Sequence, residues 1–221
     1  MSLGALFQLQ ARPRKTGGIE GGLPFAHAFS QASYSKQNER PAVIEGYHYD
    51  PTTSNKRTAI YYNANSNKLV VAFRGTDFSD PYDVWEDVRI ATGTFAGASR
   101  IKKGKEIVKA AAKKYDIPVR DVQLTGHSLG GRITQAVGQK LHSESLTALN
   151  PGSSPIDILH PSAGTGFGQV FTTSVDPVSI SGTIAQPANV NFRAPQTIEP
   201  HGLRAFGVQP GVLVQERVER P

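Results

Sequence analysis

VQLTGHSLGGRITQAVGQKL, residues 122–141, changes its pattern at a single serine. Residues 122–126 are predicted to form a buried strand, and residues 129–141 are predicted to form a helix. Ser128 lies between them, with a glycine two positions away on either side. The pattern predicts a sharp strand-to-helix turn that projects the serine from the carboxyl edge of a sheet, where open α/β folds bind ligands.

The chain around this turn also alternates strand and helix patterns. Strand patterns are found at 42–49, 58–62, 68–75, 145–150 and 169–175, with a turn at 63–67. The apolar spacing of residues 100–115 indicates a helix that ends before Pro118. Such alternation implies right-handed crossovers and predicts the α/β class, with a mainly parallel central sheet flanked by helices. Residues 212–218 fit an edge strand or a docked tail equally well.

Length and composition favour one compact domain in which long loops connect the helices and strands. The chain has 221 residues, of which 38% are hydrophobic, and its 22 glycines and 15 prolines indicate long irregular connections. Residues 1–40 show little periodicity between their glycines and are predicted to be an N-terminal arm of uncertain structure. Residues 41–221 are expected to form the folded domain.

The charge and the absence of cysteine exclude several classes of function. With no cysteine, disulfides, thiol nucleophiles and thiolate metal sites are excluded. The net charge is +6, and a basic segment contributes much of it: Arg100, Lys102, Lys103, Lys105, Lys109, Lys113 and Lys114. At helical spacing this segment is expected to be a solvated face, with contact to an anionic lipid surface as the alternative. No nucleic-acid-binding motif accompanies it.

The N-terminus lacks the pattern of a secretion signal. Its few apolar residues precede its basic ones, which is the reverse of the usual order. No stretch approaches the roughly 18 consecutive apolar residues of a membrane span. A soluble, cytoplasmic protein is the expectation, with export by another route as the alternative.

Several motifs together resemble the class 3, fungal-lipase-like family of α/β-hydrolases, over roughly residues 60–205. They are VVAFRGT (70–76), Trp85 with its acidic neighbours Glu86 and Asp87, GHSLGG (126–131), VDPV (175–178) and the late His201. The resemblance implies an α/β-hydrolase fold for residues 41–221. It also implies hydrolysis of carboxylic esters without a metal or cofactor.

The order of residues in that superfamily selects the candidate triad. The order is serine, then an acid, then histidine. Asp176 follows a predicted strand, and His201 is the only histidine after it. Ser128, Asp176 and His201 are therefore predicted as nucleophile, orienting acid and general base. Asp157 is the alternative acid, since Asp176 could instead form a turn before Pro177, and His201 could be a surface loop residue.

Two groups are expected to stabilise the negative charge of the tetrahedral intermediate. One is the backbone N–H of Leu129, which directly follows the nucleophile. The other, by resemblance to the FRG(S/T) motif of the family, is Thr76, which could alternatively only begin a turn. His127 is expected to pack against the sheet or support a loop. The histidines at 27, 48, 142 and 160 precede the candidate acid or lie in loops, and none has metal-ligand spacing.

The chain departs from the family pattern at two places. Arg132 stands where a small residue is usual after GHSLGG, and Asp87 lies one position short of the common W-x-x-D spacing. Residues 77–99 occupy the position of the family's lid, and form either an apolar flap or a fixed loop around Trp85.

The resulting prediction is a serine hydrolase that cleaves esters through an acyl-Ser128 intermediate. Lipase, phospholipase A1 and small-ester carboxylesterase remain open, as do an acyltransferase on the same triad and a silent, lipase-like binding protein. The expected partners are a lipid or small ester and, by peripheral contact, a lipid surface.

Overall fold

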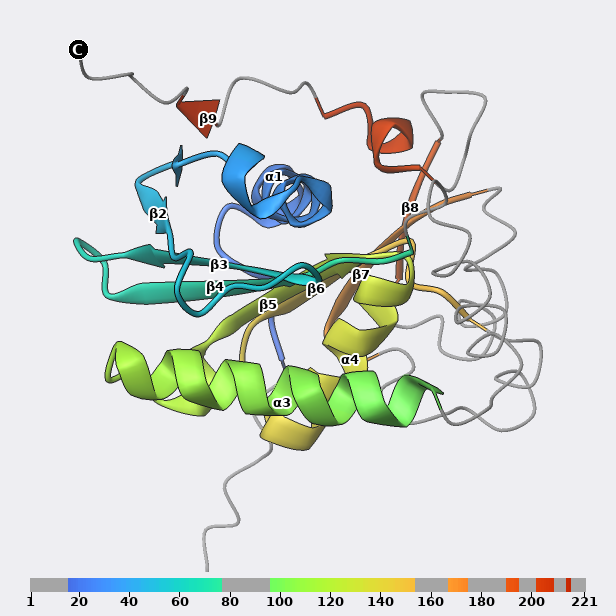
Figure 1. Cartoon of the computed structure of the whole chain (residues 1–221). Coiled ribbons are helices and arrows are strands. Elements are labelled where there is room, and N and C mark those ends of the chain that lie inside the picture. Colours follow the sequence, from blue (N-terminus) through green and yellow to red (C-terminus); the bar gives the residue numbers. More distant parts are fainter. Residues whose placement is uncertain are drawn as a thin grey trace, which may run out of the picture.

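The computed structural model describes residues 16–76, 96–153, 167–174, 190–194, 202–208 and 214–215. In these residues nine strands form one sheet in the order β8-β7-β6-β5-β4-β3-β2-β1-β9 (Figure 1). The strands are β1 (Val43–Ile44), β2 (Tyr47–Tyr49), β3 (Thr58–Asn63), β4 (Lys68–Phe73), β5 (Gln123–His127), β6 (Leu146–Leu149), β7 (Gln169–Thr173), β8 (Val190–Arg193) and β9 (Val214–Gln215). The helices are α1 (Gly22–Tyr34), α3 (Ala96–Lys114) and α4 (Leu129–Leu141), with 3₁₀ turns η1 (Gln37–Glu39), η2 (Val119–Asp121) and η5 (Leu203–Phe206).

The sheet is mixed, with a parallel and an antiparallel part. Strands β4 to β8 are parallel neighbours, whereas β4, β3, β2, β1 and β9 pair antiparallel in that sequence. In the parallel part Phe73 is opposite Gly126 and His127 is opposite Leu149, so β4, β5 and β6 end at the same edge. A mixed sheet with this parallel part, flanked by helices, confirms the predicted α/β fold class.

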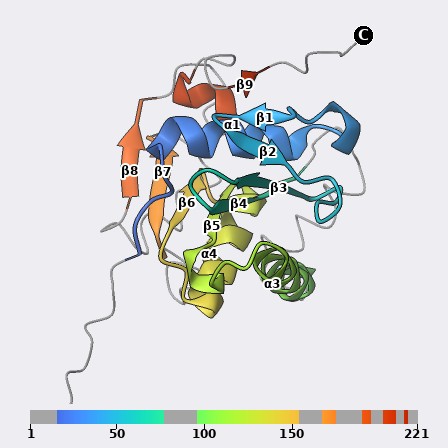
Figure 2. The same cartoon turned by 90° about the vertical axis from the view of Figure 1, so that its left-hand side faces the viewer.

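Helices cover both faces of the sheet. Helix α1 lies on one face, and α3 and α4 lie on the other (Figures 1 and 2). Each face has its own apolar cluster. Phe73, Val108 and Ile133 belong to the cluster under α3 and α4, and Phe29 and Tyr61 belong to the cluster under α1. Strands β1 and β9 lie across α1 from the sheet centre, so the antiparallel end curls around this helix.

The segment 42–49 forms a hairpin, and its prediction as one strand is wrong. Strand β1 ends at Ile44 and pairs antiparallel with β2, which begins at Tyr47. The two residues between them, Glu45 and Gly46, have φ values of 47° and 77°, as the turn of a tight hairpin requires. Glu-Gly is a weaker hairpin signal than Asn-Gly or Asp-Gly. The alternating apolar pattern on its two sides therefore indicated a single strand instead of two.

The structure shows a helix in the segment 1–40, for which the sequence patterns assigned none. Helix α1 buries Leu23, Ala26 and Phe29 against the sheet. It also buries His27, Ser30 and Ser33, so its inner face is partly polar and the apolar periodicity is weak. The helix therefore contributes to the hydrophobic core on one face of the sheet, although its sequence pattern is typical of a loop.

The basic segment lies on α3, and two of its residues have defined partners. Arg100 Nη2 donates a hydrogen bond to the carbonyl oxygen of Arg74 at 2.8 Å, and Lys114 forms an ion pair with Asp50. Lys102, Lys103, Lys109 and Lys113 are exposed on the outer side of the helix. The expected solvated face is thus observed for these four residues.

Candidate active site

Ser128 lies in a sharp turn between β5 and α4, as the sequence predicts. Its φ of 57° and ψ of −128° place a non-glycine residue in a strained backbone region. The backbone N–H of Ser128 donates to Leu149 O at 3.0 Å, and its carbonyl accepts from Gly152 N at 2.9 Å. These two bonds attach the turn to the end of β6, which helps to hold the strained conformation in place.

Glycines at 126 and 130 make the turn possible. A Cβ on Gly126 would lie 2.6 Å from the carbonyl carbon of Gly130, and a Cβ on Gly130 would overlap the carbonyl oxygen of Phe73. Both contacts are with backbone, which cannot rotate away. The helix can therefore begin directly above the sheet only because neither position has a side chain.

The segment after β4 lies against the serine turn. A Cβ on Gly75 would be 3.1 Å from the Cβ of Ser128 and 2.6 Å from the carbonyl oxygen of His127. Thr76, the next residue, is buried. The two expected donors for the intermediate, Thr76 and Leu129, thus belong to segments that touch beside Ser128.

The local field at Ser128 favours negative charge. The serine precedes the first turn of α4, where backbone N–H groups have no intrahelical acceptor and carry partial positive charge. Leu129, which supplies the first of these groups, is itself buried. A negatively charged intermediate on the serine side chain would form at the positive end of the helix dipole.

Asn150 joins the ends of two strands at the same edge, and sequence patterns did not single it out. It is fully buried and has a φ of 39°. Its Oδ1 accepts a hydrogen bond from Thr173 N at 2.9 Å, and its backbone N–H donates to Phe171 O at 2.8 Å. The signal that could have revealed it is the Asn-Pro pair directly after a strand, which is typical of a turn.

His127 contacts helix α1 from the end of β5, in agreement with the expectation that it packs against the sheet or supports a loop. It is buried, and its Nδ1 is 2.9 Å from the Tyr34 hydroxyl of α1, with which it shares a hydrogen bond. Its ring is therefore held by α1, which lies on the face of the sheet opposite α4.

The other predicted site residues lie outside the described part of the chain. Asp176 comes three positions after the end of β7, and His201 directly precedes Gly202, where the description resumes. The alternative acid Asp157 and the lid segment with Trp85 and Asp87 are also outside it. The structure thus brings together Ser128, Leu129 and residues 73–76, and the roles of Asp176 and His201 stay predictions.

Arg132, the departure after GHSLGG, lies in the first turn of α4. It is half-buried, and its backbone N–H donates to Ser128 O at 3.1 Å. That bond starts the helix immediately after the nucleophile, so the larger side chain at this position leaves the backbone of the turn intact.

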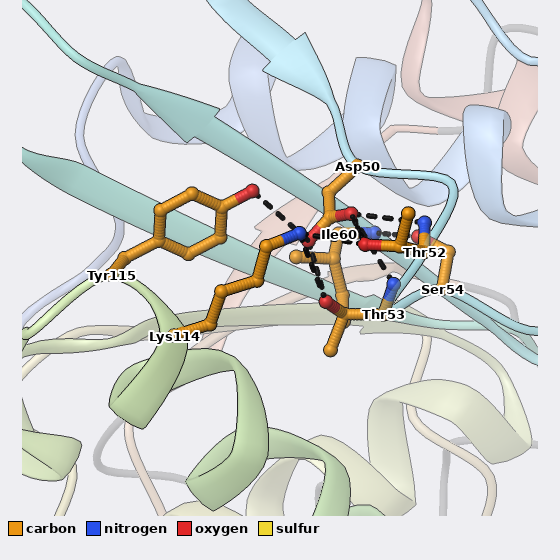
Figure 3. A network of polar contacts seen from close by, with 7 residues as sticks. All are labelled: Asp50, Thr52, Thr53, Ser54, Ile60, Lys114 and Tyr115. Atoms are coloured by element: carbon orange, nitrogen blue, oxygen red, sulfur yellow. Dashed lines mark hydrogen bonds and ion pairs between the residues drawn. The ribbon is translucent and has the colours of Figure 1, made fainter.

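A second polar cluster connects the turn before β3 to the C-terminal end of α3 (Figure 3). The buried Asp50 carboxylate accepts hydrogen bonds from the backbone and hydroxyl groups of Thr52 and Thr53, from Tyr115 OH at 3.0 Å and from Lys114 Nζ at 2.8 Å. Burial alone would raise the pKa of Asp50, but these donors outweigh it and hold the pKa below the usual carboxylate range. Each of the two carboxylate oxygens accepts three hydrogen bonds from protein donors, so the carboxylate joins the turn to the helix.

The described residues contain neither a metal-ligand cluster nor a membrane-spanning helix. Across those ranges, no group of three or more His, Asp or Glu side chains is placed to hold a metal ion. None of the helices that the structure describes combines the length and apolar character needed to cross a bilayer.

No family model matches this chain, and no curated protein matches it significantly. Among solved structures it is similar to a triacylglycerol lipase from Penicillium expansum, with a TM-score of 0.36 and 18% identity over 90% of this chain and 92% of the lipase. The candidate site therefore rests on the geometry at Ser128.

Proposed function

We propose that this protein hydrolyses carboxylic esters through a covalent acyl-Ser128 intermediate. The observation that carries the proposal is the strained backbone of Ser128 between β5 and α4, with the segment 73–75 packed against it. Such strain is retained where the surrounding structure enforces it, and it concentrates at functional sites. The motifs shared with class 3 lipases support the same chemistry.

In the proposed reaction, Ser128 Oγ attacks the ester carbonyl carbon while His201 takes the hydroxyl proton. The carbonyl oxygen becomes an oxyanion, which accepts hydrogen bonds from the backbone N–H groups of Leu129 and Thr76. Collapse of the intermediate breaks the bond to the alcohol, which leaves with the proton from His201. Water then repeats the sequence on the acyl-enzyme and releases the acid, and Asp176 holds the imidazole throughout.

The substrate is a lipid or a small acyl ester. Triacylglycerol, phospholipid and short-chain esters share the reacting group and differ in chain length and in the surface that presents them. A flap formed by residues 77–99 would make the rate depend on a lipid surface, whereas a fixed loop would leave the rate independent of it.

The test compares hydrolysis of p-nitrophenyl esters from acetate to palmitate by the wild type, Ser128→Ala and Ser66→Ala. Ser66 is the matched control, since it lies in the exposed turn between β3 and β4 at the opposite edge of the sheet. We expect Ser128→Ala to lose at least about 10³-fold in kcat, as removal of a triad nucleophile does. Ser66→Ala should retain wild-type activity, and a fluorophosphonate should label the wild type and Ser66→Ala but not Ser128→Ala.

The results also separate the alternatives. Equal rates in the wild type and Ser128→Ala would overturn the proposal. Fluorophosphonate labelling with methyl ester formation far above hydrolysis in dilute methanol would indicate an acyltransferase instead. A rate increase for long chains at their aggregation point would indicate a surface-activated lid.

A further inference from the structure

Two polar side chains of helix α1 form hydrogen bonds to segments that adjoin predicted site residues in the sequence. His27 and Tyr34 lie seven positions apart, which is about two helical turns, so they lie on the same side of the helix. The helix packs on the face of the sheet opposite α4, with η5 beside it (Figures 1 and 2). It lies outside the motifs shared with class 3 lipases and is not part of the proposed triad.

The Tyr34 hydroxyl touches both segments that meet at Ser128. It shares a 2.9 Å hydrogen bond with Nδ1 of His127, the residue before the nucleophile. It also occupies the space beside Gly75, where a Cβ would overlap the hydroxyl oxygen. One oxygen atom therefore contacts both His127 and Gly75, which precede Ser128 and Thr76, and it fixes the spacing between these two residues.

His27 anchors the segment that follows the predicted base. Its Nε2 donates a hydrogen bond to the carbonyl oxygen of Leu203 at 3.2 Å, and Leu203 is two residues after His201. Burial lowers the pKa of His27, so the ring is neutral near pH 7 with its proton on Nε2. Leu203 and Phe206 of η5 also join the apolar cluster under α1, which holds this segment to the helix.

We propose that His27 and Tyr34 are positioning residues, through which α1 sets the distance between the nucleophile turn, the Gly75–Thr76 segment and the segment after His201. The inference rests on the proposed ester hydrolysis. Displacement of reacting groups by about 1 Å can cost about 100-fold in rate. A single rigid helix that contacts all three segments keeps such displacement small.

The variants remove each contact with little change in volume. Tyr34→Phe deletes one oxygen, with Tyr62→Phe as its control because the Tyr62 hydroxyl bonds to Asn67 in an exposed turn. His27→Leu deletes the donor to Leu203, and His27→Gln restores a donor at about the same place. His48→Leu, at an exposed position of β2, is the control for His27→Leu.

The readouts are kcat, KM, the rate of fluorophosphonate labelling and the melting temperature. We expect Tyr34→Phe and His27→Leu to lower kcat and the labelling rate about 10- to 100-fold, with KM changed less than about twofold. The melting temperature should fall by only about 2–4 °C, as the loss of one hydrogen bond predicts for a chain of this size. His27→Gln should recover kcat to within about threefold of the wild type.

Three results would overturn the inference while leaving the proposed function in place. They are unchanged kcat per folded molecule, a change confined to KM, and no recovery in His27→Gln. If His27→Leu fails to fold, Tyr34→Phe still decides the role of α1, since it removes a single atom. An inactive and unlabelled wild type would overturn the proposed function itself, and the inference with it.

Discussion

At the scale of single residues, the site depends on positions where a side chain has no room. Gly130 is the clearest example of such a position, because a Cβ there would overlap the carbonyl oxygen of Phe73. The neighbouring backbone belongs to β4 in the sheet centre and cannot move aside without breaking strand pairing. The glycines of GHSLGG are therefore required by packing as well as by the backbone conformation of Ser128.

Gly130→Ala should destabilise the fold and abolish activity together. We expect a loss of about 2–4 kcal/mol in the free energy of unfolding, as overpacking against a rigid neighbour produces. Urea denaturation measures it. Gly17→Ala is the control, since a Cβ at Gly17 would meet only Glu144 O at an ordinary 3.7 Å. A stable, active Gly130→Ala would show that β4 can shift, contrary to the packing described here.

Much of the residue-scale site could be predicted from the sequence, because a strand, a serine between glycines and a helix are all local patterns. The turn at Ser128 and the bounds of α4 are confirmed. His27 and Tyr34 could not be predicted. Their partners lie in distant parts of the chain, 176 positions away for His27 and 93 for Tyr34, and no local pattern encodes such contacts.

At the scale of elements, the Asp50 cluster attaches α3 to the sheet. Four residues from the turn before β3 and the end of α3 place their donors around one carboxylate (Figure 3). The other end of α3 is attached by the bond from Arg100 to Arg74 O. The helix is thus held at both ends, and its Arg100 end holds the segment that leads to Thr76.

The Asp50 cluster predicts a specific pH dependence of stability. The pKa of Asp50 is lower in the folded state than in the unfolded state. Its contribution to the free energy of unfolding is therefore fully present above the unfolded carboxylate pKa of about 4, and it is lost as the pH falls below that value. Asp50→Asn should lower the free energy of unfolding at pH 7 by about 2–4 kcal/mol and weaken its dependence on pH between about 5 and 2.

Denaturant unfolding at several pH values tests this prediction, with Asp116→Asn as the control. Asp116 is exposed and has a φ of 53°, a conformation that asparagine also tolerates, so its substitution should change little. If Asp50→Asn kept the wild-type pH dependence, other carboxylates would be responsible for it.

At the scale of the whole molecule, α1 belongs to the core. Leu23, Ala26, Phe29 and Ala32 of the helix, and Ile19 three residues before it, are buried in the cluster under α1. Full burial of a large apolar side chain contributes about 1.5–3 kcal/mol, so Ile19, Leu23 and Phe29 together contribute an amount similar to the total stability of a domain. The sequence pattern did not indicate that α1 belongs to the core, because Ser30, Ser33 and His27 interrupt the apolar stripe on its buried face.

Truncation tests the role of α1 in the fold. A chain that begins at residue 41 should fail to fold cooperatively, because its sheet would expose the cluster under α1 to water. A chain that begins at residue 16 keeps the contacts of α1 that the structure describes, so it should melt within a few degrees of the full chain. Circular dichroism on heating distinguishes the two. A cooperative transition in the shorter chain would mean that residues 41–221 form an independent domain.

The pairing of β1 with β9 has a consequence for synthesis of the chain. Val43 and Ile44 are made early, yet their outer neighbours are Val214 and Gln215. Until Val214 and Gln215 have also left the ribosome, the outer edge of β1 lacks this partner, and unpaired strand edges promote aggregation. A newborn molecule therefore carries an unpaired strand edge for as long as the residues between β1 and β9 take to be translated, which makes this interval the one in which edge-to-edge association is most favoured.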